Sequence, residues 1–310
     1  MKDLNQYRVQ YYLGTLQNKK TIDESIRKKL KTYKMHIFNG KPHIIQIYHK
    51  PFKRLLKRSV GPRNSEEKRY FLFSGDLISY YPEIDYTFVK NRSEGHRSNG
   101  VLLKSLNQNR HWGIVDQIDS LDCSFSKKKN MAIWRGVTTG RSTKKANRFV
   151  LVKKWFHENN YVDVGFNRIV QEPNHYQEIF PNRTIENYKR PSLSPREMLR
   201  YKYIISVRGN DKDSGLNWKL ASNSVVFMAK PTVTSWLMES DLIPNFHYVL
   251  LKDDFSDLKE KIIWANRHPR IVQQISANAK KFMQRFQNKS NEEKIETEVV
   301  RRYFSIMEKS

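Results

Sequence analysis

Hydrophobic and polar positions alternate between strand-like and helix-like spacing along most of the second half of the chain. From Met131 onward, short apolar runs rich in β-branched residues are followed by stretches with the 3.6-residue spacing of amphipathic helices. The predicted strands are residues 131–134, 161–165, 203–207, 224–228 and 248–251. The predicted helices are 143–158, one from Ser194, 215–222, 233–240, 256–266, 270–287 and 291–308. Strands that alternate with helices favour an α/β fold, with a mostly parallel sheet flanked by helices.

The first part of the chain has a less regular pattern, and the basic run at 127–130 predicts a domain boundary there. We therefore expect two domains, residues 1–126 and 127–310, the second including the closing helices. The elements predicted in the first are helices at 5–17, 21–34 and 99–110, a hairpin at 36–48, a basic turn-rich loop at 50–69, and strands at 70–73 and 86–89. The hairpin follows from Asn39-Gly40, a favoured two-residue turn between two apolar runs.

The net charge of the chain indicates more about its partners than its hydrophobic composition does. Lys and Arg number 57 against 31 Asp and Glu, a formal net charge of +26, which indicates an anionic partner: nucleic acid, a phosphorylated ligand or an anionic membrane face. Hydrophobic residues make up 38% of the chain, enough to form real cores and to exclude a disordered protein. The single Cys123 excludes an internal disulfide and fits a reducing compartment. No signal peptide and no run of about 20 apolar residues is found, so we expect a cytosolic protein.

The stretch from Tyr201 to Lys219 is the first candidate for chemistry. An apolar strand ends at Arg208-Gly209, a polar loop follows, and a helix opens near Gly215. A strand, an Arg-Gly loop and a helix N-terminus form the arrangement that binds phosphate at the carboxyl end of a sheet. The alternative interpretation pairs Arg208 with a nearby carboxylate such as Asp211 or Asp213, and leaves Gly209 to the turn.

A second Arg-Gly turn has the same pattern. The strand ending at Trp134 runs into Arg135-Gly136 and a small polar loop, and basic residues follow at Arg141 and Arg148. Two such turns in one sheet favour a diphosphate site between them. For Lys144 and Lys145, which lie in the same stretch, a solvated helix face is the better interpretation.

Carboxylates provide the remaining candidates. Asp76 follows an apolar strand in a Gly-containing turn, where it can act as a general base, although Asp after Gly is also ordinary turn chemistry. Asp85 is a weaker competitor for that role. Asp211 and Asp213 have the spacing of carboxylates that hold a divalent metal, but two residues do not define an oxygen-ligand site, and we predict no metal. No HExxH, Walker loop, GxGxxG or GxSxG motif is present.

An ordered set of motifs resembles a known family. It comprises Trp134-Arg-Gly136, the segment 201–209, Ser214, Lys219, Asn223-Ser-Val-Val226, Trp236, Leu242-Ile-Pro244 and His247-Tyr-Val249. Over about residues 70–310 the chain is similar to glycosyltransferase family 90, which includes capsule-associated and lipopolysaccharide-modifying enzymes and animal protein O-glucosyltransferases. In its length and in the style of its sequence, the chain is most similar to the bacterial lipooligosaccharide-core members of the family.

This resemblance implies a GT-B-like architecture of two Rossmann-like domains with a cleft between them. It implies an inverting, metal-independent transfer of a hexose from a nucleotide-sugar, UDP-glucose or UDP-galactose, to a lipooligosaccharide core sugar, with no cofactor. The family's base corresponds to Asp76, and its phosphate contacts to Arg135, Gly136, Arg208, Gly209 and Ser214.

One departure from the family pattern concerns the helix after Ser214. Members often carry an Arg there, whereas this chain has Asn217 in a longer loop, and we expect Lys212 or Lys219 to replace the missing contact. Preorganised Arg side chains and backbone N–H groups would then stabilise the departing diphosphate in place of a metal ion.

The basic surface fits an acceptor at an anionic membrane. Clusters such as Lys50 to Arg69 would hold the enzyme at the inner face of the bacterial inner membrane, on its cytoplasmic side. Two other hypotheses compete with this one: a basic nucleic-acid-binding protein, and a metal-dependent GT-A transferase that uses Asp211 and Asp213. The ordered α/β motifs argue against the first.

Overall fold

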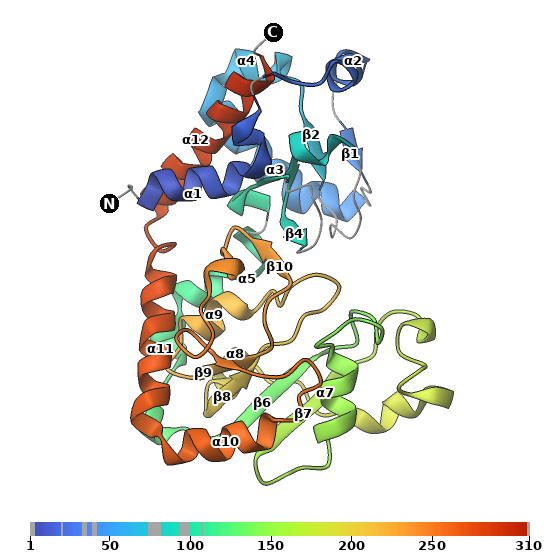
Figure 1. The fold of residues 1–310 in the computed structure, drawn as a ribbon, viewed down its shortest axis with the longest axis vertical. Coiled ribbons are helices and arrows are strands. Elements are labelled where there is room, and N and C mark those ends of the chain that lie inside the picture. The colour runs from blue at the N-terminus through green and yellow to red at the C-terminus, as the bar shows by residue number, and fades with distance from the viewer. Residues whose placement is uncertain are drawn as a thin grey trace. The chain divides into compact units, whose positions relative to one another are not determined.

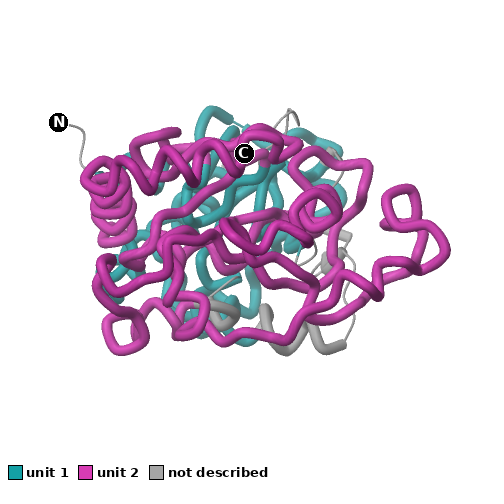
Figure 2. Tube along the Cα trace, turned by 90° about the horizontal axis from the view of Figure 1, so that it is seen from below, with its two compact units in different colours: residues 1–110, 233–239, 286–310 teal, residues 111–232, 240–285 magenta. Residues whose placement is uncertain are grey.

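The structure, a computed structural model, describes residues 4–19, 21–32, 36–38, 42–73, 82–93, 100–106 and 108–308. The chain forms two compact units (Figure 2). Unit 1 comprises residues 1–110, 233–239 and 286–310, and unit 2 comprises residues 111–232 and 240–285. The chain thus leaves unit 1 before the boundary expected at residue 126 and returns to it twice, so the last helix belongs to unit 1 and not to the C-terminal domain.

Unit 2 is built on a five-stranded parallel sheet with the order β11-β9-β8-β6-β7. The strands are β6 (Lys129–Val137), β7 (Val162–Arg168), β8 (Tyr201–Ile205), β9 (Val225–Met228) and β11 (Val249–Leu250). The helices of this part of the chain are α5 (Gln108–Asp116), α6 (Ile118–Leu121), α7 (Arg148–Trp155), α8 (Pro195–Met198), α9 (Leu216–Leu220), α10 (Leu258–Arg267) and α11 (Pro269–Gln284). Figure 1 shows the central strands between α7 and α10.

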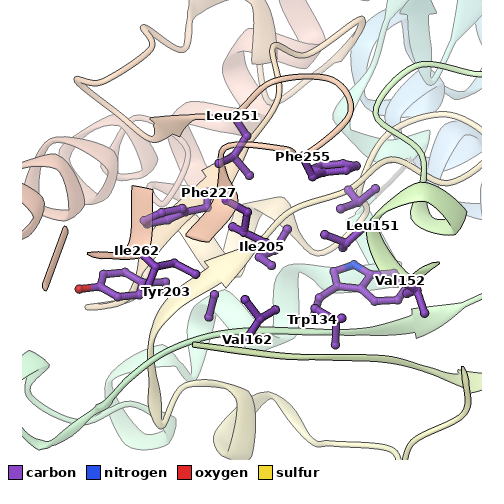
Figure 3. Close-up of a cluster of buried hydrophobic side chains, with 14 of the residues drawn as sticks. Trp134, Leu151, Val152, Val162, Tyr203, Ile205, Phe227, Leu251, Phe255 and Ile262 are labelled. Carbon is purple, nitrogen blue, oxygen red and sulfur yellow. The ribbon is translucent and has the colours of Figure 1, made fainter. Parts of the chain in front are cut away.

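The strands of unit 2 are apolar at consecutive positions because helices cover the sheet. Figure 3 shows Tyr203, Ile205 and Phe227 from two neighbouring strands in one cluster with Leu151 of α7 and Ile262 of α10. All five side chains are fully buried. This packing explains why short β-branched runs in this part of the sequence predicted the strands correctly.

Unit 1 contains a second parallel sheet, with the order β1-β2-β3-β5. Its strands are β1 (His36–Phe38), β2 (Phe71–Phe73), β3 (Thr87–Val89) and β5 (Val101–Leu102), and a separate antiparallel pair joins β4 (Asn91–Ser93) to β10 (Val233–Ser235). Its helices are α1 (Leu4–Leu13), α2 (Glu24–Thr32), α3 (Pro42–Val60), α4 (Pro62–Glu67) and α12 (Lys289–Met307). Two parallel-sheet units confirm the α/β class with Rossmann-like parts.

Buried polar contacts hold the last helix in unit 1. Glu292 of α12 accepts hydrogen bonds from Arg8 (2.9 Å) and from Lys104 (3.0 Å), and all three side chains are buried. The Tyr303 hydroxyl donates to the backbone oxygen of Tyr86 (2.8 Å). Because an unpaired buried charge is strongly destabilising, this network fixes α12 against the first helix of the chain.

The predicted hairpin and basic loop are wrong. The strand β1 pairs in parallel with β2, and the chain then forms the helix α3 from Pro42 to Val60, through Pro51. Its buried residues Phe52, Leu55, Leu56 and Ser59 have helical spacing. Periodicity alone does not separate a short apolar run in a strand from one in a helix, and Asn39-Gly40 lies outside the described residues.

Two predicted helices are also replaced by other structure. Residues 99–110 contain β5, a 3₁₀ turn (Lys104–Leu106) and the start of α5, and the segment 233–240 contains β10 instead of a helix. The pairing of β10 with β4, over 140 residues earlier, is a long-range contact that local spacing does not reveal. None of the helices that the structure describes is long and apolar enough to span a membrane.

Candidate functional site

The carboxyl ends of β6 and β8 form the switch point of the unit 2 sheet, where a parallel α/β sheet is expected to bind its ligand, and we call this place the crevice. The strands are neighbours in the sheet, but the chain leaves β6 toward β7 on one side and leaves β8 toward β9 on the other. Loops that diverge in this way open a ligand site at the carboxyl edge of a parallel sheet. Arg208-Gly209 lies in the loop after β8, whereas the turn predicted at Arg135-Gly136 is wrong, because β6 continues through both residues to Val137 and pairs there with β7.

Arg148 joins the loop after β6 to the loop after β8. Its Nε donates to the backbone oxygen of Arg208 (3.0 Å), and its Nη1 donates to the oxygen of Val137 (2.9 Å) and to Oγ1 of Thr139 (2.6 Å). Burial lowers the pKa of Arg148. The side chain predicted to bind phosphate therefore holds together the two loops that form the crevice.

Two glycines allow these loops to touch. Gly140 has a φ of 103°, and a Cβ there would lie 2.9 Å from the backbone oxygen of Gly209. A Cβ on Gly209 would lie 2.8 Å from Oγ1 of Thr139 and 3.0 Å from an Arg148 nitrogen. The Gly140 N–H also donates to Oδ1 of Asn210 (2.9 Å). Gly209 thus serves close loop packing, and neither Gly140 nor Asn210 was among the residues predicted from the sequence.

Arg208 has a buried hydrogen-bond donor that is not used. Its Nη1 donates to Oγ1 of Thr232 (2.7 Å), while its Nε is buried without a hydrogen-bond partner. Burial lowers the pKa of this guanidinium, and the nearby Asp211 carboxylate partly opposes that effect. A buried N–H without a partner is costly, which makes Arg208 suited to receive an anionic oxygen.

Lys219 forms an ion pair with Asp213. Its Nζ lies 2.5 Å from Oδ2 of Asp213, which also accepts from the Ser206 hydroxyl (2.7 Å), and Oδ1 accepts from the Gly215 N–H (2.9 Å). Despite burial, the ammonium of Lys219 lowers the pKa of Asp213 from its ordinary 3.8 to about 2. This pair fixes the loop that carries Arg208. With the Ser206 hydroxyl and the Gly215 N–H, it engages both carboxylate oxygens that the metal-dependent hypothesis requires of Asp213.

The remaining residues that were predicted to bind the donor phosphates differ in their surroundings. Arg135 turns away from the crevice: it pairs with Asp163 (2.6 Å) and donates to the backbone oxygen of Pro191 (3.1 Å). Gly136 supports packing, since a Cβ there would lie 2.7 Å from the Trp134 ring. Arg141 is exposed in the loop after β6, and Ser214 is half-buried just before α9.

Asn217 does not replace the family's Arg. It is buried in the first turn of α9, and its Oδ1 accepts from the backbone N–H of Trp218 (2.8 Å). Of the two expected replacements, Lys219 is held by Asp213, and Lys212 is half-buried in the same loop.

The predicted base lies outside the described residues. Asp76 follows β2 by three positions, but the structure describes nothing between Phe73 and Pro82. Its competitor Asp85 is described, and its Oδ1 accepts from the Thr15 hydroxyl (2.8 Å). Within the described ranges, His, Cys, Asp and Glu side chains form no group of three or more that could hold a metal ion.

We expect Lys219→Met to lower the free energy of unfolding by about 3 kcal/mol, because it leaves the Asp213 carboxylate buried without its cation. Urea denaturation measures this, with the exposed Lys144→Met as a control that should change stability by less than about 0.5 kcal/mol. The depressed pKa means that the carboxylate stabilises the fold above pH 3.8 and loses this contribution as the pH falls toward 2. Unchanged stability with lost donor binding would instead make Lys219 a donor contact.

Sequence comparison agrees with the motifs. Residues 112–307 match glycosyl transferase family 90. The chain is 31% identical over 242 residues to "O-glucosyltransferase LpsA" of Dichelobacter nodosus, covering 78% of this chain and 69% of that protein. It is 34% identical over 86 residues to "Protein O-glucosyltransferase 2" of Danio rerio, covering 28% of this chain and 17% of that protein. The chain belongs to glycosyl transferase family 90 and is a glycosyltransferase.

Comparison with solved structures gives only distant similarity. A glycosyltransferase from Rickettsia africae ESF-5 aligns over 99% of this chain and 95% of its own, with 13% identity and a TM-score of 0.42. Sucrose-phosphate synthase from Thermosynechococcus elongatus aligns over 91% of this chain and 71% of its own, with 12% identity and a TM-score of 0.39. Neither superimposes closely enough to bear on the site.

Proposed function

We propose that this glycosyltransferase moves a hexose from a nucleotide-sugar to a core sugar of lipooligosaccharide, and that the crevice between β6 and β8 holds the donor diphosphate. The observation that carries the proposal is Arg208, whose Nε is buried without a partner beside two loops clamped by Arg148. Glucose is the first choice of sugar, since the relative from Dichelobacter nodosus is named an O-glucosyltransferase. Galactose is the alternative.

The reaction is a single displacement with inversion. Asp76 takes the proton from the acceptor hydroxyl as its oxygen attacks the anomeric carbon, and the bond from that carbon to the phosphate oxygen breaks. The electron pair of the broken bond leaves with the nucleoside diphosphate. Arg208 and the backbone N–H groups of the loops stabilise the charge that develops there, so that no metal is needed.

A donor screen tests the activity. Purified protein is incubated with UDP-glucose, UDP-galactose and other nucleotide-sugars plus a truncated core oligosaccharide, and mass spectrometry follows addition of one hexose. We expect addition from UDP-glucose, with the opposite anomeric configuration to the donor by NMR of the product. Retention of configuration would contradict the single displacement, and failure with every donor would contradict the transfer itself.

Excess chelator should leave the transfer rate within about twofold of its untreated value, because Arg208 replaces a cation at the leaving group. Initial rates with and without EDTA, each repeated after adding magnesium or manganese, measure this. A loss that either metal restores would favour a metal-dependent transferase.

A further inference from the structure

The helix α3 presents a basic surface that donor binding does not use. Its exposed side chains include Lys53, Arg54, Lys57 and Arg58, and the buried residues between them face the core of unit 1. No Asp or Glu occurs from residue 42 to residue 65. This amphipathic helix therefore carries an outer face of one sign of charge, which attracts an anionic surface.

A groove of about 670 Å³ lies where the end of α3 meets α1 and α12. Figure 1 shows these three helices together in unit 1. Basic residues in its lining are Arg58, Lys294, Arg301 and Arg302. The acidic lining residues are paired, Glu293 with Arg58 (3.1 Å) and Glu298 with Arg302 (2.7 Å), while Lys294 and Arg301 are exposed.

Two exposed apolar side chains on α1 are sequence neighbours of residues that line this groove. Leu4 is 44% exposed and Tyr7 is 39% exposed, and the two residues flank Asn5 and Gln6, which line the groove. They are the large hydrophobic side chains that stand exposed among the described residues of unit 1. An aliphatic and an amphipathic aromatic residue beside a basic helix face form a combination that suits the boundary between lipid headgroups and acyl chains.

We propose that this face, formed by Leu4 and Tyr7 of α1, Lys53, Arg54, Lys57 and Arg58 of α3, and Lys294 and Arg301 of α12, docks on an anionic lipid bilayer. The basic side chains contact lipid phosphates, and Leu4 and Tyr7 enter the interface. A nucleic acid would match the charge but not an exposed Leu. This inference rests on the proposed function, since a lipid-anchored acceptor requires the enzyme at a membrane, and it assigns that contact to unit 1.

Flotation of the full-length protein with lipid vesicles tests the proposal. We expect it to bind mixed phosphatidylcholine–phosphatidylglycerol vesicles at low salt, to dissociate at high salt, and not to bind pure phosphatidylcholine. The triple variant Lys53→Gln, Arg54→Gln, Lys57→Gln should lose at least about tenfold in partition. The double variant Leu4→Ser, Tyr7→Ser should lose about tenfold without changing the charge.

A matched triple variant in unit 2 separates this face from net charge. Lys144→Gln, Arg270→Gln, Lys281→Gln removes three exposed positive charges and should change partition by less than about threefold. Equal losses in both triple variants, or no vesicle binding by the wild type, would overturn the proposal. So would duplex DNA binding that the α3 variant alone abolishes, or a dimer in solution that Leu4→Ser, Tyr7→Ser dissociates.

A measurement of activity on a water-soluble acceptor distinguishes a failure of the docking face from a failure of the proposed function. The α3 triple variant should retain wild-type transfer to free core oligosaccharide. If the wild type binds anionic vesicles but transfers no sugar, the proposed function fails while the docking face stands. If it transfers sugar but binds no vesicle, only the docking face is wrong.

Discussion

Replacing Asp76 by Asn should reduce sugar transfer by at least about a thousandfold, the largest effect expected of a single substitution in this enzyme. Asn has nearly the same shape as Asp but does not take up a proton at neutral pH. The acceptor hydroxyl would then attack while still protonated, so the barrier rises at the chemical step. The measurement is the turnover number with saturating donor and a truncated core oligosaccharide.

Asp85→Asn is the matched control in the same part of the chain. The Asp85 carboxylate accepts a hydrogen bond from Thr15, and an Asn side-chain oxygen retains that acceptor, so we expect near-normal turnover. Titration calorimetry with the nucleoside diphosphate should give unchanged affinity for Asp76→Asn, because a base acting on the acceptor does not contact the leaving group. Normal turnover in Asp76→Asn together with a loss in Asp85→Asn would transfer the role of base to Asp85.

Much of unit 2 could be predicted from the sequence because its signals are local. Ser194, with Pro195 at the first helical position and Glu197 at the third, predicted a helix start, and the structure has that capping box with hydrogen bonds in both directions. The strands β6 and β8 were predicted from short apolar runs, the second of them β-branched, and such runs are typical of strands that are covered on both faces of a parallel sheet. The loops after β6 and β8 then meet at one edge because adjacent parallel strands end there, with Gly140 against Gly209, while Arg135-Gly136 remains inside β6.

The partners of charged side chains could not be predicted in this way. Arg135 and Arg208 have the same local pattern, yet the first is bonded to Asp163 on the neighbouring strand and the second keeps a buried N–H without a partner. Which of them faces the crevice depends on strand order, a property of the whole sheet. Lys219 likewise finds Asp213 six residues earlier only because the loop folds back over the end of β8.

Arg208→Ala should lower kcat/KM for the donor by about a hundredfold to a thousandfold. The guanidinium has a buried Nε in addition to the Nη1 bonded to Thr232, so a phosphate oxygen gains a charge-assisted hydrogen bond that an Ala site lacks. Since negative charge grows on the diphosphate as the glycosidic bond breaks, kcat should fall as well as affinity. Steady-state rates over a range of donor concentrations separate the two effects.

Two comparisons show whether the lower kcat/KM of Arg208→Ala results from the loss of a contact with the donor phosphate. Arg208→Ala should weaken UDP binding strongly and uridine binding little, because only UDP carries the diphosphate. Thr232→Val, which removes the hydroxyl that orients Nη1 but keeps the charge, should cost less than about tenfold, the effect of one neutral hydrogen bond. If Arg208→Ala weakens uridine and UDP equally, the residue shapes the loop and does not bind phosphate. The charge at the leaving group would then have to come from another cation of the crevice, with the exposed Arg141 the first to test.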